Sequence, residues 1–400
     1  MIYKKLINII LVIVVLSSLF GCSKVEIPPT TTCTDDASFV VNENHPKAAA
    51  IQTLMNDYIA QGLPGMSVLI NDNDGFWIAS AGYADLENQV VMQPCHIQKL
   101  GSVTKMMMGT LVWQLIQDGL MEIDDPISKY IPEVAAKIEN GDAITLAMLV
   151  NHSSGIYDVA GNLGFNLAVI NDFSKHWTSE DIIKYLEGKP ATHLPGEAVR
   201  YSNSNTMLIG LIIDKVAGRH HSALLQSRIL NPLGMDNTVY YNYENDFPLP
   251  NLAQGYLDFH NDGGDIQNIS NLNPGSGNGY TGVYSTVTDL YKYMNALLRE
   301  KTLITPENLE LIFNSMDLYD NDSWHSSIGA IHDEFRTTLP DSIHAYGHAG
   351  GDIGYSANLN YIPHNNTIVA VTYNYGTNLG SPLRSVLGDF RRELYEICVE

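Results

Sequence analysis

The sequence predicts an α/β (α+β) fold in which one antiparallel sheet is built from both ends of the chain and flanked by helices, with a mainly helical region inserted. Strand-like runs occur in two pairs, each joined by a short turn: 66–70 with 76–81, and 357–362 with 367–375. Strands joined by turns this short pair antiparallel. Between the pairs, residues 125–300 alternate helical patterns with loops rich in Pro, Gly and Asn.

Four helices are predicted with most support from their patterns: 46–61, 103–120, 206–217 and 383–397. The second of them is apolar on nearly all sides, and a helix without a polar face is buried. Gly119 and Gly218 stand where the second and third helices are expected to end.

Composition limits the classes of function. Of the 400 residues, 45% are hydrophobic and 16% are charged, which is typical of a globular protein. The formal net charge is −22, and no Lys/Arg cluster occurs beyond the N-terminus. A chain of this charge repels polyanions, so nucleic acid is not an expected partner.

The N-terminus has the pattern of a targeting segment. Lys4 and Lys5 precede an apolar run over 6–16 that is too short to span a membrane, and Cys22 follows soon after. The pattern resembles a lipoprotein signal peptide, which implies removal of residues 1–21 and lipidation of Cys22. Residues 22–45 then read as a flexible tether, and residues 46–400 as the folded domain. We expect the domain to be anchored to a membrane through the lipid, in the cell envelope, facing the periplasm or the exterior. An uncleaved anchor helix is the alternative.

Three cysteines remain for disulfide formation: Cys33, Cys95 and Cys398. They allow at most one disulfide, and the sequence does not select the pair. No Cys/His spacing indicates structural zinc. The pair His220-His221 is expected at the surface of a helix end rather than as metal ligands, so we predict no metal site.

The first chemical motif is Ser102-Val103-Thr104-Lys105, at the start of the buried helix. Residues three apart on a helix lie on one face, so the lysine amine can reach the serine hydroxyl. A serine needs such a neighbouring base to act as a nucleophile. Taken alone, the motif is equally consistent with Ser102 as a simple helix cap.

Two further motifs follow. Tyr201-Ser202-Asn203 precedes the helix at Thr206, and there a phenol could share a proton with the Ser/Lys pair while the Asn amide holds a substrate. His348-Ala349-Gly350-Gly351 lies at the end of a strand-like run, and its small residues would let a substrate approach the strand edge. A backbone N–H in this motif could join that of Ser102 in an oxyanion hole. Each motif alone also fits a turn or a strand end.

The order Ser-x-x-Lys, Tyr-x-Asn and His-x-Gly resembles the penicillin-recognising serine hydrolases. The group within them that includes class C β-lactamases, D-Ala-D-Ala carboxypeptidases, D-aminopeptidases and related esterases is the most similar. Other stretches of this chain agree with that group: 149–156, 195–197, 233–235 and 282–286. The resemblance covers residues from about 46 to the end and implies a β-lactamase-like fold.

The resemblance also implies roles. Ser102 would be acylated, and Tyr201 with Lys105 would exchange its proton. Asn203 would orient the substrate amide, and the N–H groups of Ser102 and Gly351 would bind the oxyanion. Hydrolysis would follow in two covalent steps without any metal or cofactor.

The chain departs from the family pattern at Ala349, where related enzymes often carry a threonine whose hydroxyl helps bind a substrate carboxylate. Without that hydroxyl, we predict weak β-lactamase activity and a preference for small peptide, amide or ester substrates of the D-amino-acid type, including ones derived from peptidoglycan.

Two other readings compete with a hydrolase of this type. The first is a non-catalytic lipoprotein that binds cell-wall fragments or a partner protein through the same fold. The intact Ser102 and Lys105 argue against it. The second is a conventional lipase, which the chain does not resemble because Gly65-Met66-Ser67-Val68-Leu69 lacks the second glycine of that motif.

Overall fold

The computed structural model describes residues 28–34, 39–172, 175, 177–241, 249–258, 266–271, 277–316, 326–335, 339–340, 342–377, 381 and 383–400. The predicted signal peptide and Cys22 lie outside these residues. Among the helices of the described residues, none combines the length and the apolar character that a membrane span requires.

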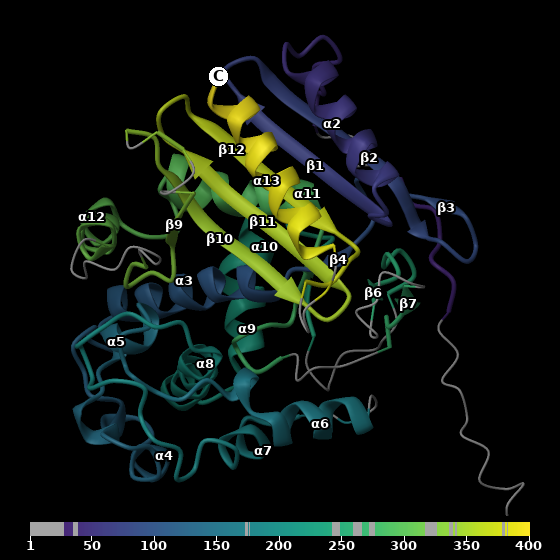
Figure 1. Ribbon diagram of the computed structural model, residues 1–400. Coiled ribbons are helices and arrows are strands. Elements are labelled where there is room, and N and C mark those ends of the chain that lie inside the picture. The colour runs from purple at the N-terminus through teal and green to yellow at the C-terminus, as the bar shows by residue number, and fades with distance from the viewer. Residues whose placement is uncertain are drawn as a thin grey trace, which may run out of the picture.

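A seven-stranded antiparallel sheet forms the centre of the described structure, in the order β3-β2-β1-β12-β11-β10-β9 (Figure 1). Its strands are β1 (Gly65–Asp72), β2 (Gly75–Asp85), β3 (Val90–Val91), β9 (His332–Glu334), β10 (Ala345–Asp352), β11 (Tyr355–Ile362) and β12 (Thr367–Tyr373). Smaller pairings join β4 (Gln98–Lys99), β8 (Val283–Ser285) and β5 (Val239–Tyr240), and β6 (Tyr256–Leu257) with β7 (Gln267–Asn268).

The α-helices have the following bounds: α2 (Ala48–Ala60), α3 (Thr104–Gln117), α4 (Pro132–Ala135), α5 (Leu146–Val150), α6 (Leu163–Asn171), α7 (Ser179–Ile183), α8 (Asn203–Ala217), α9 (His221–Leu225), α10 (Asn231–Leu233), α11 (Val287–Met294), α12 (Pro306–Asn314) and α13 (Arg384–Val399).

The two ends of the chain meet in the middle of the sheet, as the sequence predicted. β1 pairs with β12 from Met66 opposite Tyr373 to Asn71 opposite Ile368, and it pairs with β2 through the predicted hairpin. Because side chains alternate along a strand, each strand serves two cores. On β12, Val369 and Val371 face one core while Ile368 and Ala370 face the other.

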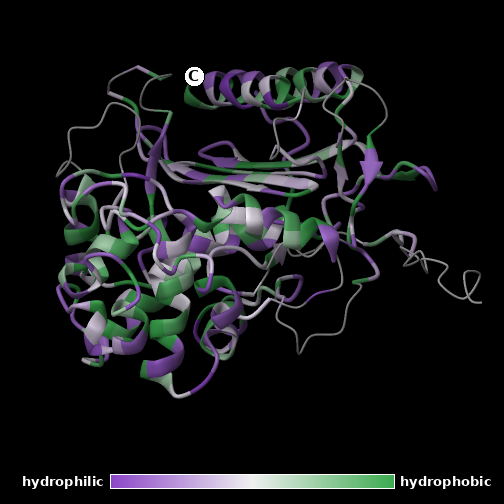
Figure 2. Ribbon diagram, turned by 60° about the horizontal axis from the view of Figure 1, so that its bottom comes forward, coloured by the Kyte–Doolittle hydropathy of each residue, from purple (hydrophilic) through white to green (hydrophobic). Residues whose placement is uncertain are grey.

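The helices cover the sheet unequally. α2 and α13 lie together on one face, where Leu54, Met55, Phe390 and Leu394 close a small core. The other face packs on α3 and α11 and continues into the inserted helical region, which forms the lower part of the molecule in Figure 1 and is separated from α13 by the sheet in Figure 2. The predicted fold, with a terminal sheet and a helical insertion, is confirmed.

A disulfide joins Cys33 to Cys95 and so connects the segment 28–34 to the chain between β3 and β4. Among the described cysteines, Cys398 on α13 is a buried free thiol. The sequence had left the pairing open.

Candidate active site

The nucleophile candidate lies at a junction between α3 and the sheet. Ser102 occupies a single 3₁₀ turn, Gly101–Val103, immediately before α3. Gly101 has a φ of +53°, which glycine adopts without the steric cost other residues carry. The turn crosses β10 so closely that a Cβ on Gly350 would stand 1.8 Å from the Leu100 carbonyl oxygen. Glycine on both sides therefore allows Ser102 to reach the strand edge.

Lys105 lies one helical turn further and is completely buried. Its Nζ is 2.9 Å from Ser102 Oγ, 2.9 Å from Asn203 Oδ1 and 2.7 Å from the Tyr280 carbonyl oxygen. Burial lowers the pKa of this amine to about 7, although the nearby carboxylates of Asp158 and Asp352 oppose that shift. A large neutral fraction near neutral pH follows, which a lysine base requires.

Tyr201 approaches the same hydroxyl from the other side. Its phenol donates a hydrogen bond of 2.7 Å to Ser102 Oγ, and the Lys105 Nζ lies 5.1 Å from the centre of its ring. Burial raises the pKa of Tyr201 far above its usual value. The phenol is therefore a neutral hydrogen-bond donor, and a tyrosinate is strongly disfavoured at this position.

Asn203 is the first residue of α8, and both ends of its amide have partners. Its Oδ1 accepts from Lys105, while its Nδ2 lies 3.3 Å from each carboxylate oxygen of Asp158. The Asp158 carboxylate also accepts from the Asn203 backbone N–H at 3.0 Å. Asp158 thus fixes the orientation of the amide, and the amide in turn holds the lysine.

His348 lies on β10, and its motif occupies the end of that strand, as the sequence predicted. Its Nδ1 donates to the Ala349 carbonyl oxygen at 2.5 Å, and its ring centre is 4.1 Å from that of His332. His152 packs on Tyr201 with ring centres 4.4 Å apart. Burial, together with the neighbouring His332 and Lys105, keeps the pKa of both His152 and His348 well below its usual value, so neutral imidazoles surround the phenol.

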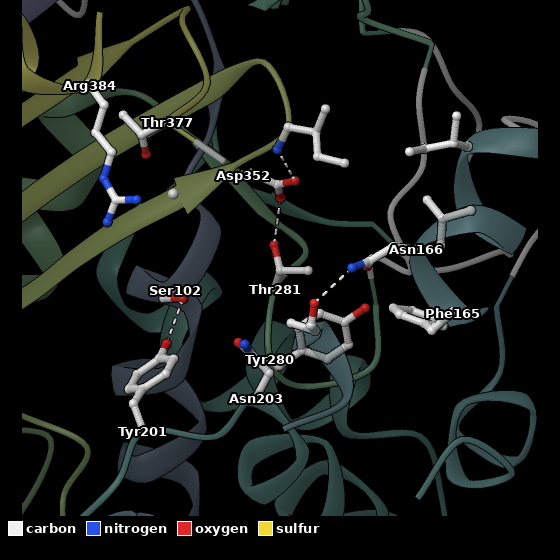
Figure 3. Close-up of a pocket in the computed structure, with 15 residues that line it drawn as sticks. Ser102, Phe165, Asn166, Tyr201, Asn203, Tyr280, Thr281, Asp352, Thr377 and Arg384 are labelled. Carbon is white, nitrogen blue, oxygen red and sulfur yellow. Dashed lines mark hydrogen bonds between the residues drawn. The ribbon is translucent and has the colours of Figure 1, made fainter. Parts of the chain in front are cut away.

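A cavity of about 480 Å³ opens beside Ser102 (Figure 3). Four of the predicted site residues line it: Ser102, Tyr201, Asn203 and Gly351. Lys105, His348, Ala349 and Gly350 are not among its lining residues. The remaining lining residues are Ala160, Phe165, Asn166, Val169, Ile170, Tyr280, Thr281, Asp352, Ile353, Thr377 and Arg384.

Among the aromatic residues, Tyr280 lines the cavity, while Tyr157 and Tyr284 do not. Asp158 and Asp352 were not predicted from the sequence. Asp158 lies two residues after the 149–156 stretch, and no motif in the sequence marks it as a site residue. Asp352 could have been found, because period-two alternation along β10 places it on the face of His348 and Gly350.

Three groups of described side chains bring potential metal ligands together: His332 with Glu334 and His348, His45 with Asp72 and Asp74, and Asp214 with His220 and His221. In the last group the sequence interpretation was wrong for His221. That residue is 1% exposed, because its ring packs into the interior between Asp214 Oδ1 at 2.9 Å and the Tyr240 hydroxyl at 2.7 Å. These bonds join α8, α9 and β5.

This fold, with a serine hydroxyl contacted by a buried lysine amine and a tyrosine phenol, defines a serine hydrolase of the Ser-x-x-Lys type. The chain belongs to the Beta-lactamase family, whose model matches residues 48–384.

Curated relatives match part of the chain. Protein flp of Staphylococcus aureus (strain MW2) is 29% identical over 193 residues, which cover 48% of this chain and 38% of flp. PbpX of Bacillus subtilis (strain 168) is 26% identical over 260 residues, which cover 65% of this chain and 61% of PbpX. The chain therefore spans less than two thirds of the length of these relatives.

Solved structures share the fold over most of the chain. D-amino acid amidase from Ochrobactrum anthropi SV3, in complex with L-phenylalanine amide, superposes with a TM-score of 0.75 at 22% identity, covering 88% of this chain and 97% of the amidase. D-stereospecific amidohydrolase from Streptomyces sp. gives 0.73 at 24% identity, covering 85% and 97%.

Proposed function

We propose that this protein is an exported, lipid-anchored hydrolase that cleaves small amide or ester bonds through an acyl-enzyme on Ser102. The observation that carries the proposal is the position of Ser102 Oγ, which is 2.9 Å from the Lys105 amine and 2.7 Å from the Tyr201 phenol. A hydroxyl with a base on one side and a proton donor on the other has what both halves of an acyl transfer need.

Lys105 is the general base in this mechanism. A neutral amine has two N–H donors and one lone pair. The fixed acceptors Asn203 Oδ1 and Tyr280 O take the two donors, so the lone pair is directed at the Ser102 hydroxyl. Lys105 removes the hydroxyl proton as Oγ attacks the substrate carbonyl carbon.

The tetrahedral intermediate carries its negative charge on the former carbonyl oxygen, and the backbone N–H groups of Ser102 and Gly351 bind it there. The neutral Tyr201 phenol passes a proton to the leaving group and regains one from the Lys105 ammonium. Water then attacks the acyl-enzyme with Lys105 again accepting a proton, which releases the acid and restores Ser102.

A small amide is the best-supported substrate class. Two structures that share this fold are named for amide hydrolysis, a D-amino acid amidase and a D-stereospecific amidohydrolase. Ala349 supplies no hydroxyl for a substrate carboxylate, which argues against efficient turnover of penicillins. Peptidoglycan-derived peptides belong to the same chemical class and are included in the proposal.

The experiment is intact-protein mass spectrometry of the full chain in detergent, after exposure to p-nitrophenyl acetate or to benzylpenicillin. We expect a covalent adduct or released nitrophenol with the ester, and neither with Ser102→Ala. Rapid turnover of benzylpenicillin would contradict the substrate assignment. A folded protein that forms no adduct and turns over neither reagent would favour a non-catalytic lipoprotein that binds wall fragments.

The envelope location has a separate test. Protein extracted from membranes should begin at a diacylglyceryl-modified Cys22 and lack residues 1–21. A Cys22→Ala variant should keep the unprocessed mass. An unmodified Cys22 in the wild type would contradict the lipid anchor and favour an uncleaved anchor helix.

A further inference from the structure

Asp352 is the one carboxylate among the described residues that line the cavity. It is the last residue of β10, and because strand side chains alternate, it lies on the same face as His348 and Gly350. Gly350 is the point where the Ser102 turn touches the strand, since a Cβ there would stand 3.2 Å from the Ser102 backbone nitrogen. Two residues of strand, about 7 Å, separate Asp352 from that point.

The carboxylate is held in place but not neutralised by a direct ion pair. Its Oδ2 accepts from the Thr281 hydroxyl at 2.8 Å, and its Oδ1 accepts from the Ile353 backbone N–H at 2.7 Å (Figure 3). The residue is only 4% exposed, and no Lys or Arg of the described chain forms a salt bridge with it. A carboxylate has about four acceptor sites, so this one keeps capacity for a further donor.

The buried ammonium groups of Lys99 and Lys105 lie near enough to interact with the charge of Asp352, but neither forms a direct ion pair with it. The Lys99 ammonium is buried over the rings of Tyr284 and Tyr355, with ring centres 5.5 and 5.4 Å away. Arg384, on the cavity wall, is exposed and begins α13. A buried charge is stabilised most by a direct, hydrogen-bonded ion pair, and a cationic ligand in the cavity would supply one to Asp352.

We propose that Asp352 binds the protonated α-amino group of the substrate, so that the enzyme selects amides and esters of amino acids with a free amino group. The inference rests on the proposed acyl-enzyme at Ser102. In such a substrate the nitrogen is two bonds, each about 1.5 Å, from the carbonyl carbon. With that carbon on Ser102 Oγ and its oxygen at the Ser102 and Gly351 N–H groups, the proposed pose directs the ammonium toward Asp352, which lines the same cavity as Ser102 and Gly351.

The rest of the cavity fits the same substrate class. Phe165, Val169 and Ile170 give one wall an apolar surface for an amino-acid side chain. The negative charge of Asp352 opposes the carboxylate of a β-lactam or of an N-succinylated amide. Asp352 and Ala349 thus disfavour the same acidic substrates, one by repulsion and the other by the missing hydroxyl.

The test compares phenylalanine amide with N-acetylphenylalanine amide at pH 7, each as both enantiomers, in the full-length protein. The two are measured as substrates and as competitive inhibitors of p-nitrophenyl acetate hydrolysis. For the preferred enantiomer we expect the free amine to be favoured roughly 10- to 100-fold, the range of a hydrogen bond to a charged group. Asp352→Asn should reduce that preference to near one, because the amide keeps the shape and loses the charge.

Asp172→Asn is the matched control. It removes one carboxylate from the exposed end of α6, outside the cavity wall, and should retain the wild-type preference. An Asp352→Asn variant that keeps the preference, or a wild type that favours the acetylated amide, would overturn the inference while the ester reaction at Ser102 still stands. Failure of p-nitrophenyl acetate to acylate Ser102 would instead contradict the proposed acyl-enzyme, and the inference about Asp352 would fail with it.

Discussion

Lys105 and Ser102 share a contact whose direction is set by their surroundings: Nζ is 2.9 Å from Oγ, and two fixed acceptors occupy its other hydrogen-bonding positions. Those acceptors belong to separate elements, Asn203 on α8 and the Tyr280 carbonyl on the chain before β8. The geometry therefore depends on how α8 and the segment before β8, both parts of the inserted region, pack against the start of α3.

The first prediction concerns the pH dependence of catalysis. The pKa of Lys105 is lowered to about 7, and the base must be neutral to accept a proton. The value of kcat/KM should therefore rise through about pH 7 and fall about tenfold per pH unit on the acid side. Initial rates with p-nitrophenyl acetate from pH 5 to 9 measure it. A flat profile over that range would argue against Lys105 as the base.

The second prediction is that Tyr201→Phe lowers kcat and leaves the acidic limb near pH 7. Tyr201 has a raised pKa and donates as a neutral phenol, so its loss removes a donor but not the group that titrates. A loss of about 10²- to 10⁴-fold is expected for a group that transfers a proton. If the acidic limb moved or disappeared, the tyrosine would be the titrating base.

The third prediction links the same lysine to stability. In the unfolded chain the pKa of Lys105 returns to 10.5, so between about pH 7 and 10.5 the unfolded state binds more protons than the folded state. This contribution to the free energy of unfolding thus rises with pH across that window. The shift corresponds to at most about 5 kcal/mol of destabilisation near pH 7.

Lys105→Met should therefore abolish activity and raise the free energy of unfolding at pH 7. We expect a net gain of about one to a few kcal/mol, because the loss of the lysine hydrogen bonds offsets part of the stabilisation. Urea unfolding at pH 7 and pH 9.5 checks it. The difference between variant and wild type should shrink at the higher pH, and a difference that grew would contradict the linkage.

The fourth prediction compares two glycines. Gly350→Ala would place a Cβ 1.8 Å from the Leu100 carbonyl oxygen, so the Ser102 turn must move away from β10 and activity should fall by more than 10²-fold. Gly388→Ala, on α13, meets nothing within 4 Å and should leave activity intact while stabilising the helix by about 1 kcal/mol. Ester hydrolysis and thermal unfolding of both variants measure the contrast.

The fifth prediction concerns the Cys33–Cys95 disulfide, which closes a loop across 62 positions. A reductant should lower the free energy of unfolding of the wild type by about 2–4 kcal/mol. The double variant Cys33→Ser/Cys95→Ser should have the lower stability from the start and show no response to the reductant. A response in the double variant would point to another effect of the reductant.

The sequence predicted the parts of the site that depend on local spacing. Ser102 and Lys105 are three residues apart, and helical geometry alone brings them together. The approach of Tyr201 and β10 to the same hydroxyl was predicted from the order of the motifs, as the family resemblance implies. The bonds of Asn203 to Lys105 and Asp158 could not be predicted, because they depend on the packing of α8 against the 3₁₀ segment that follows Asp158.

The cysteine pairing could not be predicted from the sequence for a related reason. Three cysteines allow three pairs, and only the folded path of the chain brings Cys33 to Cys95. Asp352 is different. Once β10 is recognised as a strand, its alternation places Asp352 beside the cavity, and the motif itself would have been enough to find it.

The pairing of β1 with β12 also affects how the chain is made. Met66 finds its partner only when Tyr373 has been synthesised, so the central pair of strands cannot close on a nascent chain. Before that point β1 can pair only with β2, which itself pairs with the two-residue strand β3, and an isolated hairpin is marginally stable in water. The central sheet therefore stays open until translation is nearly complete, and its two halves close last.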